Sequence, residues 1–241
     1  MLSFLKDKPI DNFLSTDIHS HLLPGLDDGT KTISESIEII AALQSLGIQR
    51  IVTTPHIMAD YYPNTGQLIF EKLDEIKNEL IRQNIEIDIS AAAEYYIDEH
   101  FFQRLENDEK LLSFGESFVL VETPFYNKPL FLNEALFKLK SLGYQPVLAH
   151  PERYIYLQEN YSDVHAIFDS QVYLQINIPS LVGYYSKPAR KLAEYLIDHE
   201  MVQFLGSDLH NMKQFEAYKK ALGSKYFDKC RQLFLYNQTL S

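Results

Sequence analysis

Side chains that can bind metal ions recur along this chain of 241 residues. Five of the eight histidines follow short apolar runs typical of buried strands, and the two runs between them end in glutamates. These residues are His19, His21, His56, Glu94, Glu122, His150 and His210. Imidazole and carboxylate ligands without thiolates suit Mn²⁺, Fe or Zn²⁺. The other histidines, His100, His165 and His199, lie in helical patterns, so we expect them to lie outside such a site.

The spacing of these side chains indicates a repeated strand–helix unit. Successive members from His19 to His150 are separated by about one unit, and Asp208 follows His150 after two. The strand between His150 and Asp208 ends in Asn177 without a histidine or an acid. In a barrel of parallel strands all carboxyl ends meet at one face, where active sites of this fold lie. Burying so many imidazoles and carboxylates together would be costly without cations, so the pattern predicts a metal site.

Strands and helices must alternate to position these residues. Strands are expected at 16–20, 50–54, 86–92, 118–122, 146–149, 172–176 and 202–205. A helix with a capping box of Thr32 and Glu35 follows the first strand. Further helices are expected at 67–84, 97–112, 133–142 and 187–199, with two shorter ones after the last strand. This alternation favours one closed barrel; an open doubly wound sheet is the alternative, but the first strand lacks its Gly-rich phosphate loop.

Composition limits the classes of function. Lys and Arg number 22 against 33 Asp and Glu, a formal charge of −11 that argues against non-specific nucleic-acid binding. The single cysteine, Cys230, allows no internal disulfide and lies far from the histidine motifs, so it is a poor candidate nucleophile. No apolar run approaches the roughly 18 residues that span a bilayer. Residues 1–9 reach charged side chains too early for a signal peptide. We therefore expect a cytoplasmic protein without membrane insertion.

The motifs, taken in order, resemble the PHP (polymerase and histidinol phosphatase) superfamily. More narrowly, they resemble its bacterial tyrosine-protein phosphatases of the CpsB/CapC/YwqE type. The motifs are DIHSHLLPGLDDG at 17–29, TTPH at 53–56, AEY at 93–95, AHPER at 149–153 and GSDLHN at 206–211. The resemblance spans about residues 15–215 and therefore most of the chain.

This resemblance implies an α/β fold, a distorted (β/α)7 TIM-like barrel of the PHP type, as a single domain over 1–241. It also implies two or three divalent ions, usually Mn²⁺, with Fe or Zn²⁺ as alternatives. The ligands carried over from the family are His19, His21, Asp28, His56, Glu94, Glu122, His150, Asp208 and His210. Nine ligands exceed the coordination of one ion, which agrees with at least two. Asp27 either orients a ligand or forms an Asx turn.

The resemblance further implies hydrolysis of phosphotyrosine by a metal-activated hydroxide. Arg153 would hold the phosphate with its planar fork, and Asp208 or His210 would assist the leaving phenol. Where family members carry a second arginine this chain has Lys213, a second candidate substrate contact. From the residues alone, the loop 61–64 is a candidate for the rim of the substrate site, with ordinary loop aromatics as the alternative. The implied partner is a phosphotyrosine protein, a bacterial tyrosine kinase that controls capsule or exopolysaccharide synthesis.

Three alternatives remain at this stage. Another phosphoesterase of the superfamily, such as a histidinol-phosphate phosphatase, would use the same metals and differ only at the rim. A nuclease is disfavoured by the acidic charge. A non-catalytic docking protein for a tyrosine kinase would use the metals for structure alone. The oligomeric state and the role of residues 216–241 are not readable from the pattern.

Overall fold

The computed structural model describes residues 12–240, so the interpretation of residues 1–9 lies outside it. The strands are β1 Thr16–Asp17, β2 Arg50–Thr53, β3 His56–Ile57, β4 Asp88–Ala91, β5 Glu94–Tyr96, β6 Phe118–Glu122, β7 Gln145–Ala149, β8 Tyr173–Asn177 and β9 Phe204–Gly206. The α-helices are α1 Ile33–Ser45, α2 Gly66–Arg82, α3 Glu99–Glu106, α4 Leu132–Ser141, α5 Ile155–Glu159, α6 Tyr161–Asp169, α7 Lys187–Asp198, α8 Met212–Leu222 and α9 Lys225–Cys230. Three 3₁₀ helices are η1 Pro151–Arg153, η2 Ile178–Val182 and η3 Tyr236–Gln238.

All pairs of these strands are parallel, in the orders β1-β2-β4 and β3-β5-β6-β7-β8-β9. β2 and β3 follow each other directly along the chain, as do β4 and β5, so each pair is one strand that bends. Pro55 lies at the first bend and has no N–H for the ladder. Hydrogen bonds still cross the bend, because the Glu94 amide donates to the Pro55 carbonyl at 3.1 Å. The sheet is therefore continuous, with seven strand positions.

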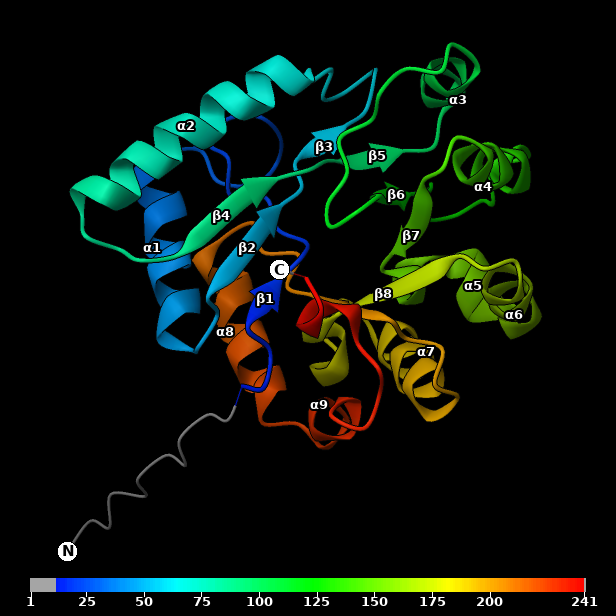
Figure 1. The fold of residues 1–241 in the computed structure, drawn as a ribbon. Helices are drawn as coiled ribbons and strands as arrows, with labels where there is room; N and C mark the ends of the chain where they lie inside the picture. Colours follow the sequence, from blue (N-terminus) through cyan, green and yellow to red (C-terminus); the bar gives the residue numbers. More distant parts are fainter. Residues whose placement is uncertain (1–11, 241) are drawn as a thin grey trace, which may run out of the picture.

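The barrel closes through the segments that follow β1 and β9. Ser20 pairs with Leu209 in a parallel bridge, and the Asp208 amide donates to the His19 carbonyl at 2.7 Å. The strands lie in a ring with the helices outside it (Figure 1). The predicted closed α/β barrel is confirmed, and the open-sheet alternative is wrong. Because every strand is parallel, all carboxyl ends lie on one face of this ring.

Apolar side chains fill both sides of the sheet, which explains why most of its strands read as near-continuous apolar runs. One cluster packs inside the ring and consists of Ile18, Val52, Ala92, Phe114, Phe118, Leu120, Val147, Ala149 and Phe204, with Tyr173, Tyr236 and Leu240 against it. A larger cluster lies mainly between the sheet and the helices. The inner positions nearest the carboxyl ends are polar, and they form the site described below.

Several element boundaries differ from expectation. The predicted helix over 97–112 is wrong in length: α3 ends at Glu106, and Asp108 adopts a left-handed conformation with φ of 52°. The helices α5 and α6 between β7 and β8 were not predicted. The capping box is confirmed, since the Glu35 amide donates to Thr32 Oγ1 and the Thr32 amide donates to Glu35 Oε2. The two short helices after the last strand are confirmed as α8 and α9.

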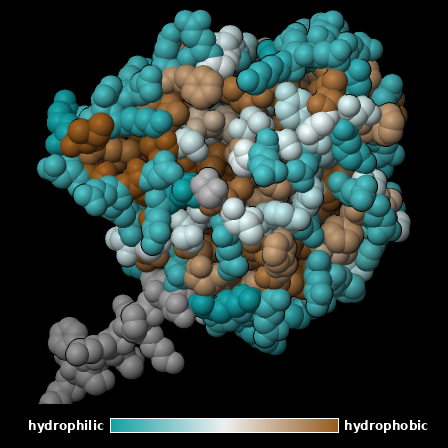
Figure 2. All heavy atoms as spheres, in the orientation of Figure 1, coloured by the Kyte–Doolittle hydropathy of each residue, from teal (hydrophilic) through white to brown (hydrophobic). Residues whose placement is uncertain are grey.

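The surface is largely hydrophilic on the face shown in Figure 2. On the face shown in Figure 2, hydrophilic side chains cover the outer helices and smaller hydrophobic patches lie between them. Within residues 12–240, no helix has the length and apolar character needed to cross a membrane.

Candidate metal centre

Nine side chains meet at the carboxyl end of the barrel. His19 and His21 follow β1, and Asp208 and His210 follow β9, so the closing segments carry four of them. The nine form four overlapping groups, and within each group one ligand atom per residue lies within 4.8 Å of the others. These groups are His21–Asp28–His56–His210, His19–His21–Glu94, His19–His150–Asp208 and His56–Glu94–Glu122. Across the described chain, they comprise the nine residues that the resemblance implied as ligands and no other.

Glu94 is the centre of the buried part of the cluster. Its Oε2 lies 3.2 Å from His19 Nε2, 3.4 Å from His21 Nε2 and 3.2 Å from His56 Nδ1. Its Oε1 lies 2.9 Å from His150 Nε2. Glu94 is fully buried, as are His19 and His21. One carboxylate therefore joins four imidazoles, as a ligand shared between neighbouring ions would.

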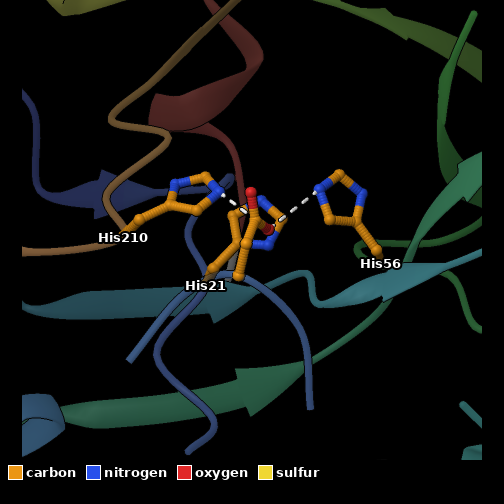
Figure 3. A group of neighbouring side chains, drawn as sticks. His21, His56 and His210 are labelled. Atoms are coloured by element: carbon orange, nitrogen blue, oxygen red, sulfur yellow. Dashed lines mark ion pairs between the residues drawn. The ribbon is translucent and has the colours of Figure 1, made fainter. Parts of the chain in front are cut away.

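A second group lies toward solvent. His21, His56 and His210 point toward one another from three different elements (Figure 3). Asp28 Oδ1 lies 3.6 Å from His56 Nε2 and 3.4 Å from His210 Nε2. His56 also reaches the buried part, since its Nδ1 lies 3.0 Å from Glu122 Oε1. His21 and His56 therefore link the exposed group to the buried one.

Hydrogen bonds at the far side of two rings determine which nitrogen faces the centre. His19 Nδ1 donates to Gln175 Oε1 at 2.7 Å, and His21 Nδ1 donates to Asp27 Oδ2 at 2.8 Å. In the neutral imidazoles this leaves a lone pair on each Nε2, and the two Nε2 atoms are 3.3 Å apart. Lone pairs facing each other and two carboxylates repel unless a cation lies among them. The residues present therefore fit divalent metal ions.

Unpaired buried nitrogens support the same conclusion. His56 Nδ1 is close to two carboxylates but forms no hydrogen bond of adequate geometry, and the buried His150 Nδ1 has no hydrogen-bond partner. Such unsatisfied buried groups are rare and need an explanation. A cation facing His56 Nδ1 accounts for the first of them.

Charges in the centre shift one another's pKa values. Burial by itself lowers the pKa of His56, but the negative charges of Glu94 and Glu122 outweigh it and raise that pKa to about 9. Burial by itself raises the pKa values of Glu94 and Asp208, but the neighbouring histidines hold both well below their usual range. The centre therefore attracts positive charge, whether as protons or as metal ions.

Asp27 combines both roles that the sequence left open. Its Oδ1 accepts a hydrogen bond from the Gly29 amide at 2.9 Å, which closes an Asx turn. Its Oδ2 accepts from His21 and from the His56 amide at 3.0 Å. The turn therefore holds Asp28 at the cavity while the same carboxylate orients the His21 ring.

Arg153 lies beside Asp208 at the wall of the cavity. Its Nη1 donates to Asp208 Oδ2 at 2.7 Å. Its guanidinium lies between two aromatic rings, 4.8 Å from the Phe125 centroid and 4.3 Å from that of Tyr185.

The cavity has a volume of about 360 Å³ and is lined by Asp28, His56, Met58, Glu94, Tyr96, Glu122, Pro124, Phe125, Tyr126, His150, Arg153, Asp208 and His210. A planar cation and aromatic walls therefore surround the carboxylates and imidazoles.

The sixth strand position, expected to contribute nothing, supplies a chain of amides. Gln175 Nε2 donates to Asn177 Oδ1 at 2.9 Å, and Asn177 Nδ2 donates to Asp208 Oδ2 at 2.6 Å. Tyr185 also donates to Asp208 Oδ2, at 3.1 Å. Together with the hydrogen bond that His19 donates to Gln175, this network fixes the orientation of two candidate ligands, His19 and Asp208. Sequence reasoning searched for metal-binding residue types and passed over polar residues in an apolar strand, which were the available signal.

Other candidates lie elsewhere. Lys213 is exposed near the start of α8 and does not line the cavity. His100, His165 and His199 lie outside the cluster, as expected, and His165 Nε2 instead hydrogen-bonds Tyr195. Cys230 is buried in α9, and burial raises the pKa of its thiol to about 12.

The sequence family described as "Capsular polysaccharide synthesis, CpsB/CapC" matches residues 15–238. The chain belongs to the CpsB/CapC family. A putative tyrosine-protein phosphatase CapC from Staphylococcus aureus is 30% identical over 239 residues, covering 93% of this chain and 92% of the relative. The tyrosine-protein phosphatase YwqE from Bacillus subtilis is 32% identical over 197 residues, covering 82% of this chain and 78% of the relative. The resemblance inferred from the motifs is confirmed.

A solved structure of the CpsB/CapC family has the same fold. It comes from work on YwqE from Bacillus subtilis and CpsB from Streptococcus pneumoniae, described as unique metal-dependent tyrosine phosphatases. The TM-score is 0.78 at 30% identity, over 94% of this chain and 96% of the other. The predicted distorted barrel is thus confirmed by a relative.

Proposed function

We propose that this CpsB/CapC chain, as a single domain over residues 1–241, is a metal-dependent protein-tyrosine phosphatase. The observation that carries the proposal is the convergence of His19 Nε2 and His21 Nε2, which lie 3.3 Å apart, on the carboxylates of Glu94 and Asp208. That arrangement calls for cations in a cavity open to substrate. Relatives of this chain are named tyrosine-protein phosphatases, which supports the choice of reaction.

We assign two or three divalent ions, with Mn²⁺ as the first choice, to the nine clustered residues. The ligands are His19, His21, Asp28, His56, Glu94, Glu122, His150, Asp208 and His210. When bound, such ions polarise phosphoryl oxygens and activate water for attack on phosphorus. Gln175 and Asp27 hold the histidine rings in the orientation that binding needs.

We assign the phosphate contact to Arg153. Asp208 occupies only one of its terminal nitrogens, so the other N–H groups of the guanidinium are available to a phosphate oxygen. The two flanking rings hold the planar guanidinium against the wall. Asp208 positions Arg153, and His210 stands at the solvent side of the cavity, where it assists the leaving phenolate. A phenol with a pKa near 10 is a good leaving group, so it needs little further acid catalysis.

The proposed substrate is a phosphotyrosine protein, specifically a bacterial tyrosine kinase of capsule or exopolysaccharide synthesis. The aromatic wall of Tyr96, Phe125 and Tyr126 suits the phenyl ring of phosphotyrosine. The family description links the chain to capsular polysaccharide synthesis. We place the reaction in the cytoplasm, because the ATP that a kinase needs to phosphorylate the proposed substrate is found there.

The test compares two phosphoesters with metal-loaded protein. Phosphotyrosine peptide and histidinol phosphate are supplied to the native chain, to His150→Ala and to His199→Ala, and phosphate release is followed. We expect the peptide to be hydrolysed with the higher kcat/KM. His150→Ala should lose at least about 100-fold, because even indirect partners of metal ligands cost 10- to 100-fold. His199, exposed at the end of α7, is the matched control, and its replacement should leave kcat/KM unchanged.

Faster turnover of histidinol phosphate would move the proposal to a small-molecule phosphatase with the same centre. Absence of hydrolysis of either ester by folded, metal-loaded protein would leave the kinase-docking role.

A further inference from the structure

A second hollow opens directly from the wall of the metal cavity. It has a volume of about 540 Å³ and shares Met58, Tyr96 and Pro124 with the metal cavity. We call it the side groove. Its walls come from three loops at the carboxyl end of the barrel: the loop after β3, the turn between β5 and α3, and the segment between β6 and α4. The two hollows therefore adjoin each other, so the residues next to a phosphotyrosine bound in the metal cavity would lie near the side groove.

The side groove exposes large apolar side chains. Tyr61 is 72% exposed on one wall, and Leu130 is fully exposed on the other. Ile97 and Phe131 complete an apolar floor. Single exposed apolar residues are common, but two that face one hollow beside a binding site mark an interaction surface. A small phosphoester held in the metal cavity would leave them uncovered.

The charge of the side groove is negative. Asp60, Asp98 and Glu99 line it, and none of these carboxylates forms an ion pair with another described residue. One oxygen of the Asp98 carboxylate caps α3 by accepting a hydrogen bond from the Phe101 amide at 2.7 Å. The one lysine that lines the groove, Lys128, has its Nζ 3.9 Å from Asp163 Oδ1. Asp163 lies outside the groove and partly neutralises the lysine charge. The groove is therefore complementary to a cationic ligand.

Resting on the proposed phosphatase function, we propose that the side groove binds the peptide segment adjoining the phosphotyrosine and selects segments that carry a lysine or arginine beside an apolar residue. The cation would meet Asp60 and Glu99, and the apolar side chain would cover Tyr61 and Leu130. The enzyme would thus recognise residues that flank the phosphotyrosine as well as the phosphorylated ring.

The test uses two phosphotyrosine peptides of equal length, one flanked by lysine and leucine and the other by glutamate and leucine. p-Nitrophenyl phosphate, which has no flanking residues, is the reference. We expect kcat/KM to be about three- to tenfold higher for the lysine peptide, from two exposed charge pairs of modest strength. The preference should shrink as ionic strength rises. In the double variant Asp60→Asn/Glu99→Gln the peptide ratio should approach one.

Two further variants sharpen the test. Asp74→Asn removes an exposed carboxylate on α2 outside the groove and should keep the preference. Leu130→Ser should raise KM for both peptides and leave their ratio intact. Equal hydrolysis of the two peptides, or a preference that survives in the double variant, would overturn the proposal that the side groove selects the peptide. Hydrolysis of p-nitrophenyl phosphate in the same samples would still support the proposed phosphatase function. Absence of all hydrolysis with metal-loaded protein would overturn both.

Discussion

Two candidate ligands in the buried part of the centre, His19 and Asp208, depend on neighbours that fix their orientation. Gln175 Oε1 accepts a hydrogen bond from His19 Nδ1, and Asn177 connects Gln175 to Asp208. Because Asp208 Oδ2 accepts three hydrogen bonds, its Oδ1 is the oxygen left to face the histidines. Orientation of this kind raises metal affinity without adding a ligand.

Asn177→Ala should therefore weaken metal binding by about 10- to 100-fold. It removes the short bond to Asp208 Oδ2 and leaves the Gln175 amide without its acceptor. The measurement is the dissociation constant for Mn²⁺, followed by calorimetry on protein stripped with chelator. Asn133→Ala, at an exposed position on α4, is the matched control. An unchanged Mn²⁺ affinity in Asn177→Ala would show that the amide chain serves packing alone.

Cys230 should have no part in the reaction. Burial raises the pKa of its thiol to about 12, so almost none is thiolate near neutral pH, and thiolate is the reactive form. Cys230→Ala should keep the native kcat. Iodoacetamide should not modify the folded chain, and hydrolysis measured during the treatment should stay at its full rate. Rapid alkylation that abolishes hydrolysis would contradict this account.

At the scale of elements, the turn that carries Asp27 and Asp28 depends on Gly29. A Cβ at Gly29 would lie 2.3 Å from the His21 carbonyl oxygen and 2.5 Å from His21 Cβ. The carbonyl is held in place, because it accepts a hydrogen bond from the Thr30 amide at 3.1 Å. The turn would therefore have to move away from the centre.

Gly29→Ala should lower the free energy of unfolding by about 1–3 kcal/mol, as overpacking does. It should also weaken metal binding, because Asp28 would shift. The matched control is Gly66→Ala in the first turn of α2, where the nearest atom would be 3.5 Å away and alanine favours the helix. Denaturant unfolding of both variants gives the comparison, and equal stability would show that the turn tolerates the methyl group.

Sequence periodicity predicts the strand–helix alternation well, because strands buried on both faces must be apolar along their length. Strand-end spacing also predicted eight of the nine candidate ligands, since few other constraints place histidine and acid at so many strand ends, whereas Asp28 came from the family resemblance alone. The bends at Pro55 and at 92–93 were not, because they depend on how neighbouring strands pair. The end of α3 was missed for a local reason, the left-handed Asp108. The roles of Gln175 and Asn177 follow from contacts across the barrel, which spacing does not reveal.

For the molecule as a whole, the candidate metal centre and the barrel closure are one structure. The hydrogen bonds that close the ring join the backbone of residues 19–21 to that of residues 208–209. Those residues include three of the nine clustered side chains, those of His19, His21 and Asp208, and a fourth, His210, follows directly. Ions held there would therefore bind both sides of the closure, which links the occupied site to the integrity of the barrel.

The most direct measurement is a titration of Mn²⁺ into chelator-stripped protein. Bound ions per chain and hydrolysis of a phosphotyrosine peptide are followed in the same samples. We predict that stripped protein is inactive and that hydrolysis rises with bound Mn²⁺ to a maximum at two or three ions per chain. Full hydrolysis by protein that holds no metal ion would contradict the account.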